Sequence, residues 1–136
     1  MLETARNTVD KSQSENLLDQ IRRGFAGKIL AEQTTCDGLP TVWVGRENVK
    51  SLLNALHDDT SPRFEMLFDL TAIDERLRSN RQGQPASEFT VVYHLMSFSG
   101  NCDVRIKVPL QDSDLLIPTI IDIWPNANWY ERETWD

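Results

Sequence analysis

The chain is short of the residue types on which several classes of metalloprotein depend. Its 136 residues include only two cysteines, Cys36 and Cys102, and two histidines, His57 and His94. Structural zinc and iron–sulfur centres need three or four clustered ligands, and these residues are far apart in the sequence, which argues against both kinds of centre. The two cysteines are expected to remain free thiols.

Positive charge is also scarce. The chain has 14 basic and 21 acidic residues, a formal charge of −7, and its basic residues do not cluster. Because nucleic-acid binding requires a basic surface facing the phosphates, no nucleic-acid partner is expected. No apolar run approaches the roughly 20 residues that cross a bilayer, and the N-terminal residues lack a hydrophobic signal core. The sequence therefore predicts a cytoplasmic protein without a membrane span of its own.

What the chain does contain is the composition of one globular domain. Apolar residues make up 40% and charged residues 26%, and the length suits a single hydrophobic core. Residues 1–13 are polar and show no apolar period, which predicts a flexible N-terminal tail. Residues 14–136 are expected to form a single domain.

Periodicity and turn residues predict the secondary structure. Helices are predicted where apolar residues recur at spacings of three and four, or where proline and asparagine mark a helix start: about 14–25, 47–57, 118–124 and from 126 or 128 onward. Strands are predicted at 28–33, 39–44, 64–71, 89–98 and 103–110. The order α-β-β-α-β-β-β-α-α predicts an α+β fold, with a mainly antiparallel sheet of about five strands and helices packed on one face.

Two of the strands carry explicit predictions about which side chains are buried. In 103–110, Val104, Ile106 and Val108 should face the core while Arg105 and Lys107 face water, because side chains alternate along a strand. In 64–71, the alternation predicts that one face of a mostly buried strand is formed by Phe64, Met66, Phe68 and Leu70.

Acid–base chemistry has candidate carboxylates in Asp69, Asp74 and Glu75, and His94 is a further candidate. The simpler interpretation is structural, because Asp74-Glu75 is typical of a solvated strand end and a histidine in a strand is typical of cross-strand hydrogen bonding. No phosphate-binding loop, dinucleotide fingerprint or nucleophile motif accompanies them. They support only an alternative function, a small stand-alone enzyme with a pocket on the sheet face.

The C-terminal residues stand apart in composition. Three of the four tryptophans lie in the last thirteen residues. On a helix, Trp129, Arg132, Glu133 and Asp136 share one face. Two carboxylates and one guanidinium flanked by tryptophan can pair with a partner's Arg or Lys, or hold a neighbouring loop of the same chain. The predicted interface comprises Trp129, Tyr130, Glu131, Arg132, Glu133, Trp135 and Asp136. The open alternative is that Trp124 and Trp129 belong to the core and that the charges are solvated.

Four stretches carry a resemblance to a known family. They are Phe68-Asp-Leu70, Val92-Tyr-His-Leu95, Arg105-Ile-Lys-Val-Pro109 and Asp122-Ile-Trp-Pro-Asn-Ala-Asn-Trp-Tyr-Glu-Arg-Glu-Thr-Trp-Asp136. Over residues 40–136 the sequence resembles the 30-kDa subunit of respiratory complex I, which in bacteria is the C subunit of NADH-quinone oxidoreductase. Residues 68–78, with the loop that follows, are especially similar to the C portion of the fused C/D form.

This resemblance implies a structural and assembly role in the peripheral arm, without catalytic residues or chemistry of its own. The whole complex transfers electrons from NADH to quinone and translocates protons. FMN, the iron–sulfur clusters and quinone would belong to other parts of the complex, so no cofactor is expected here. The implied partners are the cluster-bearing and quinone-site subunits. The implied location is peripheral, on the cytoplasmic side of the bacterial inner membrane, with membrane association only through the complex.

The family signature continues past the point where this chain stops. Its next elements, Phe-Gly-Ile, Gly-His and Leu-Arg-Arg, are not in the sequence. The final Thr-Trp-Asp136 also lacks the glycine or polar residue that usually ends a helix. We therefore expect the parent chain to continue beyond Asp136, in either the fused C/D form or the separate C form.

Overall fold

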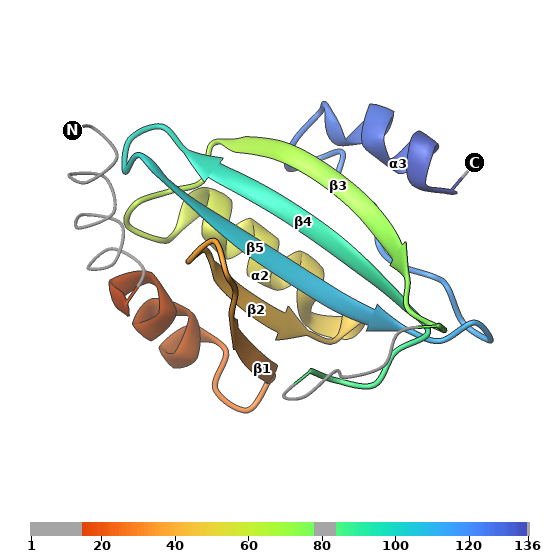
Figure 1. The fold of residues 1–136 in the computed structure, drawn as a ribbon. Helices are drawn as coiled ribbons and strands as arrows, with labels where there is room; N and C mark the ends of the chain where they lie inside the picture. Colours follow the sequence, from red (N-terminus) through yellow and green to blue (C-terminus); the bar gives the residue numbers. More distant parts are fainter. Residues whose placement is uncertain (1–14, 78–83, 136) are drawn as a thin grey trace.

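The computed structural model describes residues 15–77 and 84–135 (Figure 1). A helix over residues 15–24 is followed by β1 (Ile29–Thr34), β2 (Pro40–Val44), α2 (Arg46–Asp58), β3 (Met66–Asp74), β4 (Phe89–Ser97), β5 (Cys102–Leu110) and α3 (Ala127–Trp135). The predicted tail, residues 1–13, lies outside the described residues. None of the helices in the described part of the chain is long and apolar enough to cross a bilayer.

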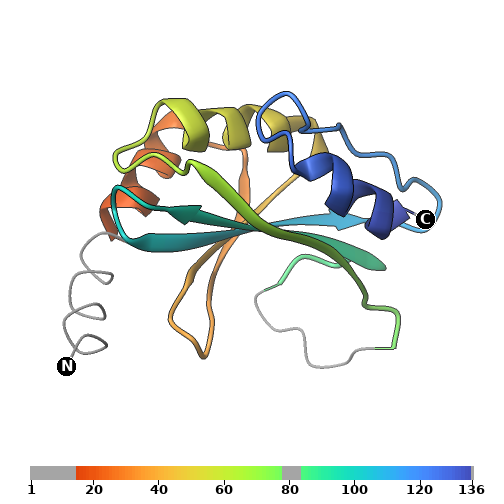
Figure 2. The ribbon, with the colours of Figure 1, turned by 90° about the horizontal axis from the view of Figure 1, so that it is seen from above.

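The strands form one sheet in the order β1-β2-β5-β4-β3. Three neighbouring pairs are antiparallel, whereas β2 runs parallel to β5. Figure 2 shows the helix over residues 15–24, α2 and α3 on the same side of the sheet. The predicted α+β fold with helices on one face is confirmed, although the sheet is mixed.

The core lies between the helices and the sheet. On β5, Val104, Ile106 and Val108 are fully buried, as the alternation predicted. The helix α2 presents its apolar stripe to the same layer through Val49, Leu52, Leu53 and Leu56, all fully buried. Burial of this apolar surface is the main free-energy term that holds the layers together.

The prediction of a helix over 118–124 is wrong. The backbone N–H groups of Ile123 and Trp124 both donate to the carbonyl of Ile120, at 3.0 Å, so the chain makes a single turn there. Pro118 and Pro125 leave too few residues between them for a helix to propagate beyond its costly first turn. The segment is apolar because Ile120, Ile123 and Trp124 are buried in the core, not because it is helical.

The prediction that Phe64, Met66, Phe68 and Leu70 form one face of a mostly buried strand is wrong for Met66 and Phe68, whereas Phe64 and Leu70 are buried. A register shift between Leu67 and Asp69 places both Phe68 and Asp69 near His94 on β4. Such a bulge adds one residue to a strand and changes which face the following side chains occupy. Leu67 and Leu70 are therefore buried, while Phe68 is 48% exposed.

The last helix is fixed to this bulged strand by two side-chain hydrogen bonds. Asn126 Nδ2 donates to the carbonyl oxygen of Leu67, and Tyr130 Oη donates to that of Phe68, each at 3.0 Å. The positions of α3 and β3 are thus coupled, although about 60 residues separate them in the sequence.

Candidate interaction site

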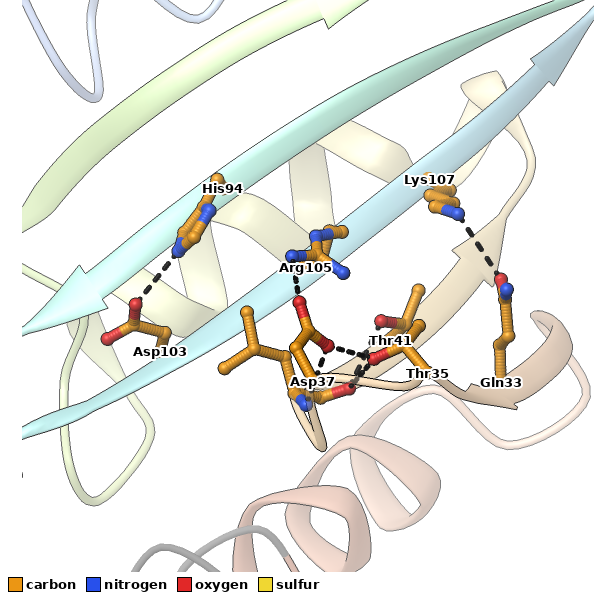
Figure 3. A network of polar contacts seen from close by, with 9 residues as sticks. Gln33, Thr35, Asp37, Thr41, His94, Asp103, Arg105 and Lys107 are labelled. Atoms are coloured by element: carbon orange, nitrogen blue, oxygen red, sulfur yellow. Dashed lines mark hydrogen bonds and ion pairs between the residues drawn. The ribbon is translucent and has the colours of Figure 1, made fainter. Parts of the chain in front are cut away.

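The face of the sheet opposite the helices carries a network of polar contacts (Figure 3). We call it the open face, because the helices of the described residues lie on the other side (Figure 2). Asp103, Arg105 and Lys107 of β5 contribute to it, together with His94 of β4. Their half-buried side chains contact partners within the chain, so the expectation that Arg105 and Lys107 simply face water is wrong.

Arg105 holds the tip of the β1–β2 hairpin against β5. Its guanidinium donates to Asp37 Oδ2 at 2.9 Å, and Asp37 also accepts hydrogen bonds from the Thr35 hydroxyl and the Leu39 amide. Gly38 supplies the positive φ of 76° that the turn needs. The hydrogen bonds from Arg105 and Thr35 hold the pKa of Asp37 well below its usual range.

We expect Asp37→Asn to lower the free energy of unfolding at pH 7 by less than about 1 kcal/mol, because Asp37 is half exposed and the pair is screened. A carboxyl whose pKa is lower in the folded state stabilises above its unfolded pKa of about 3.9 and loses that contribution as pH falls. Urea unfolding at several pH values should therefore show the two proteins converging in acid. If the difference in unfolding free energy between the two proteins widened below pH ~4, the lowered pKa of Asp37 would be wrong.

Lys107 covers a buried tryptophan on the same face. Its ammonium lies 5.4 Å from the centre of the Trp43 ring, and Gln33 Oε1 accepts hydrogen bonds from Trp43 Nε1 at 2.9 Å and Lys107 Nζ at 3.3 Å. Trp43 is fully buried although it lies outside the core cluster beneath the helices. The arrangement resembles a small second layer, in which polar side chains shield one aromatic ring.

The candidates for acid–base chemistry do not form one cluster. Asp69 pairs with His94 across β3 and β4, but the two side chains bond different partners, and Asp74 lies farther along β3. His94 Nε2 lies 2.9 Å from Asp103 Oδ2, Asp69 accepts the Leu70 amide, and Asp74 binds the Arg76 guanidinium. The hydrogen bonds from Arg76 lower the pKa of Asp74 to about 2. Asp69 and Asp74 are about 17 Å apart along β3 at the usual rise per residue. Two surface hollows, of about 410 and 370 Å³, are lined by other residues.

Glu75, one of the candidate carboxylates, is buried, which the sequence did not indicate. It is only 3% exposed, and the Thr90 hydroxyl donates to its Oε2. Its expected role as part of a solvated strand end is therefore wrong. Asp74 and Glu75 are adjacent in the sequence, and nothing in their local spacing distinguishes the exposed carboxylate from the buried one.

The predicted interface residues on α3 fall into two groups, those that bond other parts of this chain and those that are exposed. Tyr130 bonds the Phe68 carbonyl, and Glu131 accepts hydrogen bonds from the Ile120 amide at 2.9 Å and the Thr119 hydroxyl at 2.7 Å. Tyr130 and Glu131 therefore connect α3 to β3 and to the segment before α3. The exposed members are Trp129, Arg132 and Glu133.

The exposed residues of α3 have the side-chain types that the interface hypothesis requires, an aromatic ring and charges. Trp129 is 66% exposed, so only Trp124, at 2%, fits the alternative that both tryptophans belong to the core. Spacings of three and four residues place Trp129, Arg132 and Glu133 on one face of the helix. The side chains of Trp135 and Asp136 lie outside the described part.

The potential metal ligands and the two thiols of the described residues do not gather in one place. No group of three or more His, Cys, Asp or Glu side chains is gathered there that could hold a metal ion. Cys36 is exposed and Cys102 is buried, and no disulfide joins the two thiols.

These features define an α+β domain with internally paired polar groups and an exposed, tryptophan-bearing helix. Residues 42–136 match the family described as respiratory-chain NADH dehydrogenase, 30 Kd subunit. The chain belongs to this family, which confirms the resemblance noted in the sequence.

Similar proteins agree with the family assignment. The chain is 58% identical over 104 residues to the C/D subunit of NADH-quinone oxidoreductase from Acidiphilium cryptum, covering 76% of this chain and 18% of that protein. Identity to the C/D subunit from Acinetobacter baylyi is 52% over 128 residues, covering 94% and 21%. The chain thus spans about a fifth of the length of these relatives.

A solved structure shares the fold. It is described as Nqo5 of the trypsin-resistant fragment (1-134), and it matches with a TM-score of 0.69 and 25% identity. The match covers 88% of this chain and 86% of the solved one.

Proposed function

We propose that this chain serves as a structural and assembly domain of an NADH-quinone oxidoreductase, the complex that transfers electrons from NADH to quinone and translocates protons. The observation that carries the proposal is the family match over residues 42–136, together with identity above 50% to C/D subunits of that enzyme. The domain would act at the periphery of the complex, on the cytoplasmic side of the inner membrane.

The domain would contribute docking surfaces rather than chemistry. The contacts of Asp69, Asp74 and His94 support this. Asp69 and His94 pair across the two strands, yet each of the three side chains bonds a different neighbour. FMN, iron–sulfur clusters and quinone would be held by other parts of the complex. The partners would be the cluster-bearing and quinone-site subunits.

The exposed face of α3 is the first docking surface. Trp129 supplies an aromatic anchor, while Arg132 and Glu133 supply one charge of each sign. A partner that covers this face would offer a basic side chain to Glu133 and a carboxylate to Arg132. Removing one member of such a desolvated pair is costly, because the other charge stays buried without a counter-charge.

The experiment replaces Glu133 in the chromosomal gene. We expect Glu133→Ala to lower the amount of assembled complex and the NADH:quinone activity of membranes together, so that activity per assembled complex is unchanged. Blue-native electrophoresis and quinone-reductase assays measure the two quantities. The matched control is Glu15→Ala, an equally simple truncation of an exposed glutamate on the first helix.

Two results would contradict this proposal at different levels. Normal assembly with lost turnover per complex would point to a direct role of Glu133 in electron or proton transfer. Deletion of the coding region for this chain without loss of the complex or its activity would overturn the proposed function itself.

A further inference from the structure

An apolar stripe lies on the open face at the β3 side of the sheet. Met66 pairs directly with Met96 across β3 and β4, and the Phe68 ring lies 5.1 Å from the His94 ring. Phe98 lies in the turn directly after β4, and its backbone amide donates to Glu65, the residue before Met66. Phe68 is 48% exposed and Phe98 is 66% exposed, while both methionines are half-buried. We call Met66, Phe68, Met96 and Phe98 the β3–β4 stripe.

The stripe differs from the rest of the open face. Toward β2 and β5, the polar groups bond one another, as in the Asp37–Arg105 pair of Figure 3. Large apolar side chains in the stripe remain in contact with water instead. Exposed apolar residues that gather in one place are a mark of an interaction surface, and methionine adapts readily to a partner's shape.

The turn that carries Phe98 is held in place before any partner arrives. Glu65 Oε1 accepts the Phe98 amide at 2.9 Å, and Ser97 Oγ accepts the Gly100 amide at 3.0 Å. Gly100 is buried against the Pro62 ring, where a Cβ would approach to 2.3 Å. A fixed aromatic anchor loses little conformational freedom on binding, so more of its contact energy remains as affinity.

Acidic side chains border the stripe. Glu65 and Asp69 are both exposed. The Glu65 carboxylate is bonded by the Phe98 amide and by Ser99, and Asp69 has one oxygen engaged by the Leu70 amide. A carboxylate has further lone pairs beyond the one such a bond uses. Together with the chain's net charge of −7, this border favours a partner with basic side chains.

We propose that the β3–β4 stripe is a second docking surface, and that it binds another protein of the complex through apolar side chains flanked by Arg or Lys. The inference rests on the proposed function, because it assumes assembly into a multisubunit complex. The helix α3, which carries the first docking surface, is bonded to the strand that carries the stripe, since Tyr130 Oη donates to the carbonyl of Phe68. The two surfaces would meet along the edge of the sheet at β3.

Photo-crosslinking in cells tests this proposal directly. Phe98 is replaced by p-benzoylphenylalanine in the chromosomal gene, and membranes are irradiated and separated by denaturing electrophoresis. The matched control carries the same replacement at Leu30, a 51% exposed residue on β1 at the opposite edge of the sheet. We expect a covalent adduct with a different protein of the complex at position 98, at least about tenfold stronger than at position 30.

The other outcomes contradict the proposal. An adduct with a second copy of this chain would make the stripe a self-association surface. An adduct with lipid would make it a membrane contact. No adduct in cells that assemble the complex normally would mean that nothing covers the stripe.

Substitutions separate this inference from the proposed function. We expect Phe98→Ser and Asp69→Lys each to lower the amount of assembled complex by about tenfold, as for a hot-spot residue. The controls Leu30→Ser and Asp112→Lys should assemble normally, and urea unfolding should show that Phe98→Ser keeps its stability. If Glu133→Ala lost assembly while Phe98→Ser assembled normally, only the proposal that the stripe is a docking surface would be overturned. Normal assembly after deletion of the whole chain would overturn the proposed function.

Discussion

Replacement of Ile106 by alanine is expected to lower the free energy of unfolding by about 2–5 kcal/mol. Ile106 is fully buried at the middle of β5, where it pairs with Val42 of β2 and Tyr93 of β4. The strands on both sides fix the backbone, so the structure has little freedom to close around the missing atoms. The free energy lost includes the transfer of the removed apolar atoms out of water and the cost of the cavity that they leave. Urea unfolding followed by tryptophan fluorescence measures the change.

The neighbouring residue provides the matched control. Lys107 lies on the opposite face of β5, half-buried over the Trp43 ring. Lys107→Ala removes that contact and a 3.3 Å hydrogen bond to Gln33, which together should cost less than about 1 kcal/mol. Equal losses in the two variants would mean that the assignment of faces along β5 is incorrect.

Gly100→Ala is expected to destabilise the chain by about 1–3 kcal/mol, the usual cost of forcing an extra methyl group into a packed site. A Cβ at Gly100 would lie 2.3 Å from Pro62 Cγ and 2.5 Å from Pro62 Cβ. The proline ring is part of the backbone and cannot rotate away as a long side chain would. The β4–β5 turn or the loop before β3 must therefore shift. The change is measured as a lower urea midpoint.

A second glycine separates crowding from the general effect of adding a methyl group. Gly24 lies at the end of the first helix, with no atom within 4 Å of the position of its added Cβ. Gly24→Ala should leave stability unchanged or raise it by up to about 1 kcal/mol, because alanine restricts the unfolded chain and favours the helix. If Gly100→Ala were equally well tolerated, the close approach to Pro62 would be wrong.

Local periodicity accounts for the elements that the sequence predicted well. The helix expected over 47–57 is α2, Arg46–Asp58, and the strand expected over 103–110 is β5, Cys102–Leu110. In both, one face meets the core along the whole element, so the spacing of apolar residues records the burial. The turn between β1 and β2 follows from residue type rather than periodicity, because Gly38 adopts a positive φ that favours glycine.

The features that the sequence did not predict depend on distant parts of the chain. The parallel pairing of β2 with β5 joins residues about 64 positions apart, such as Thr41 and Arg105. The bulge at Phe68 interrupts a regular alternation without any glycine to mark it. In the candidate site, the spacing within α3 predicted a shared face for Trp129, Arg132 and Glu133. The residue types could not show that Glu131 would bond Ile120 instead of a partner.

The hydrogen bonds from α3 to β3 affect whether a strand of another chain can add to the edge of the sheet. β3 is an edge strand, and the outward backbone groups of an edge strand are a template to which a foreign strand can add. Asn126 and Tyr130 already occupy the carbonyls of Leu67 and Phe68, and the bulge between Leu67 and Asp69 breaks the regular spacing that an added strand would need. This part of the edge is therefore closed to strand addition. A partner can contact the side chains of the β3–β4 stripe without extending the sheet, which reduces the risk of edge-to-edge aggregation.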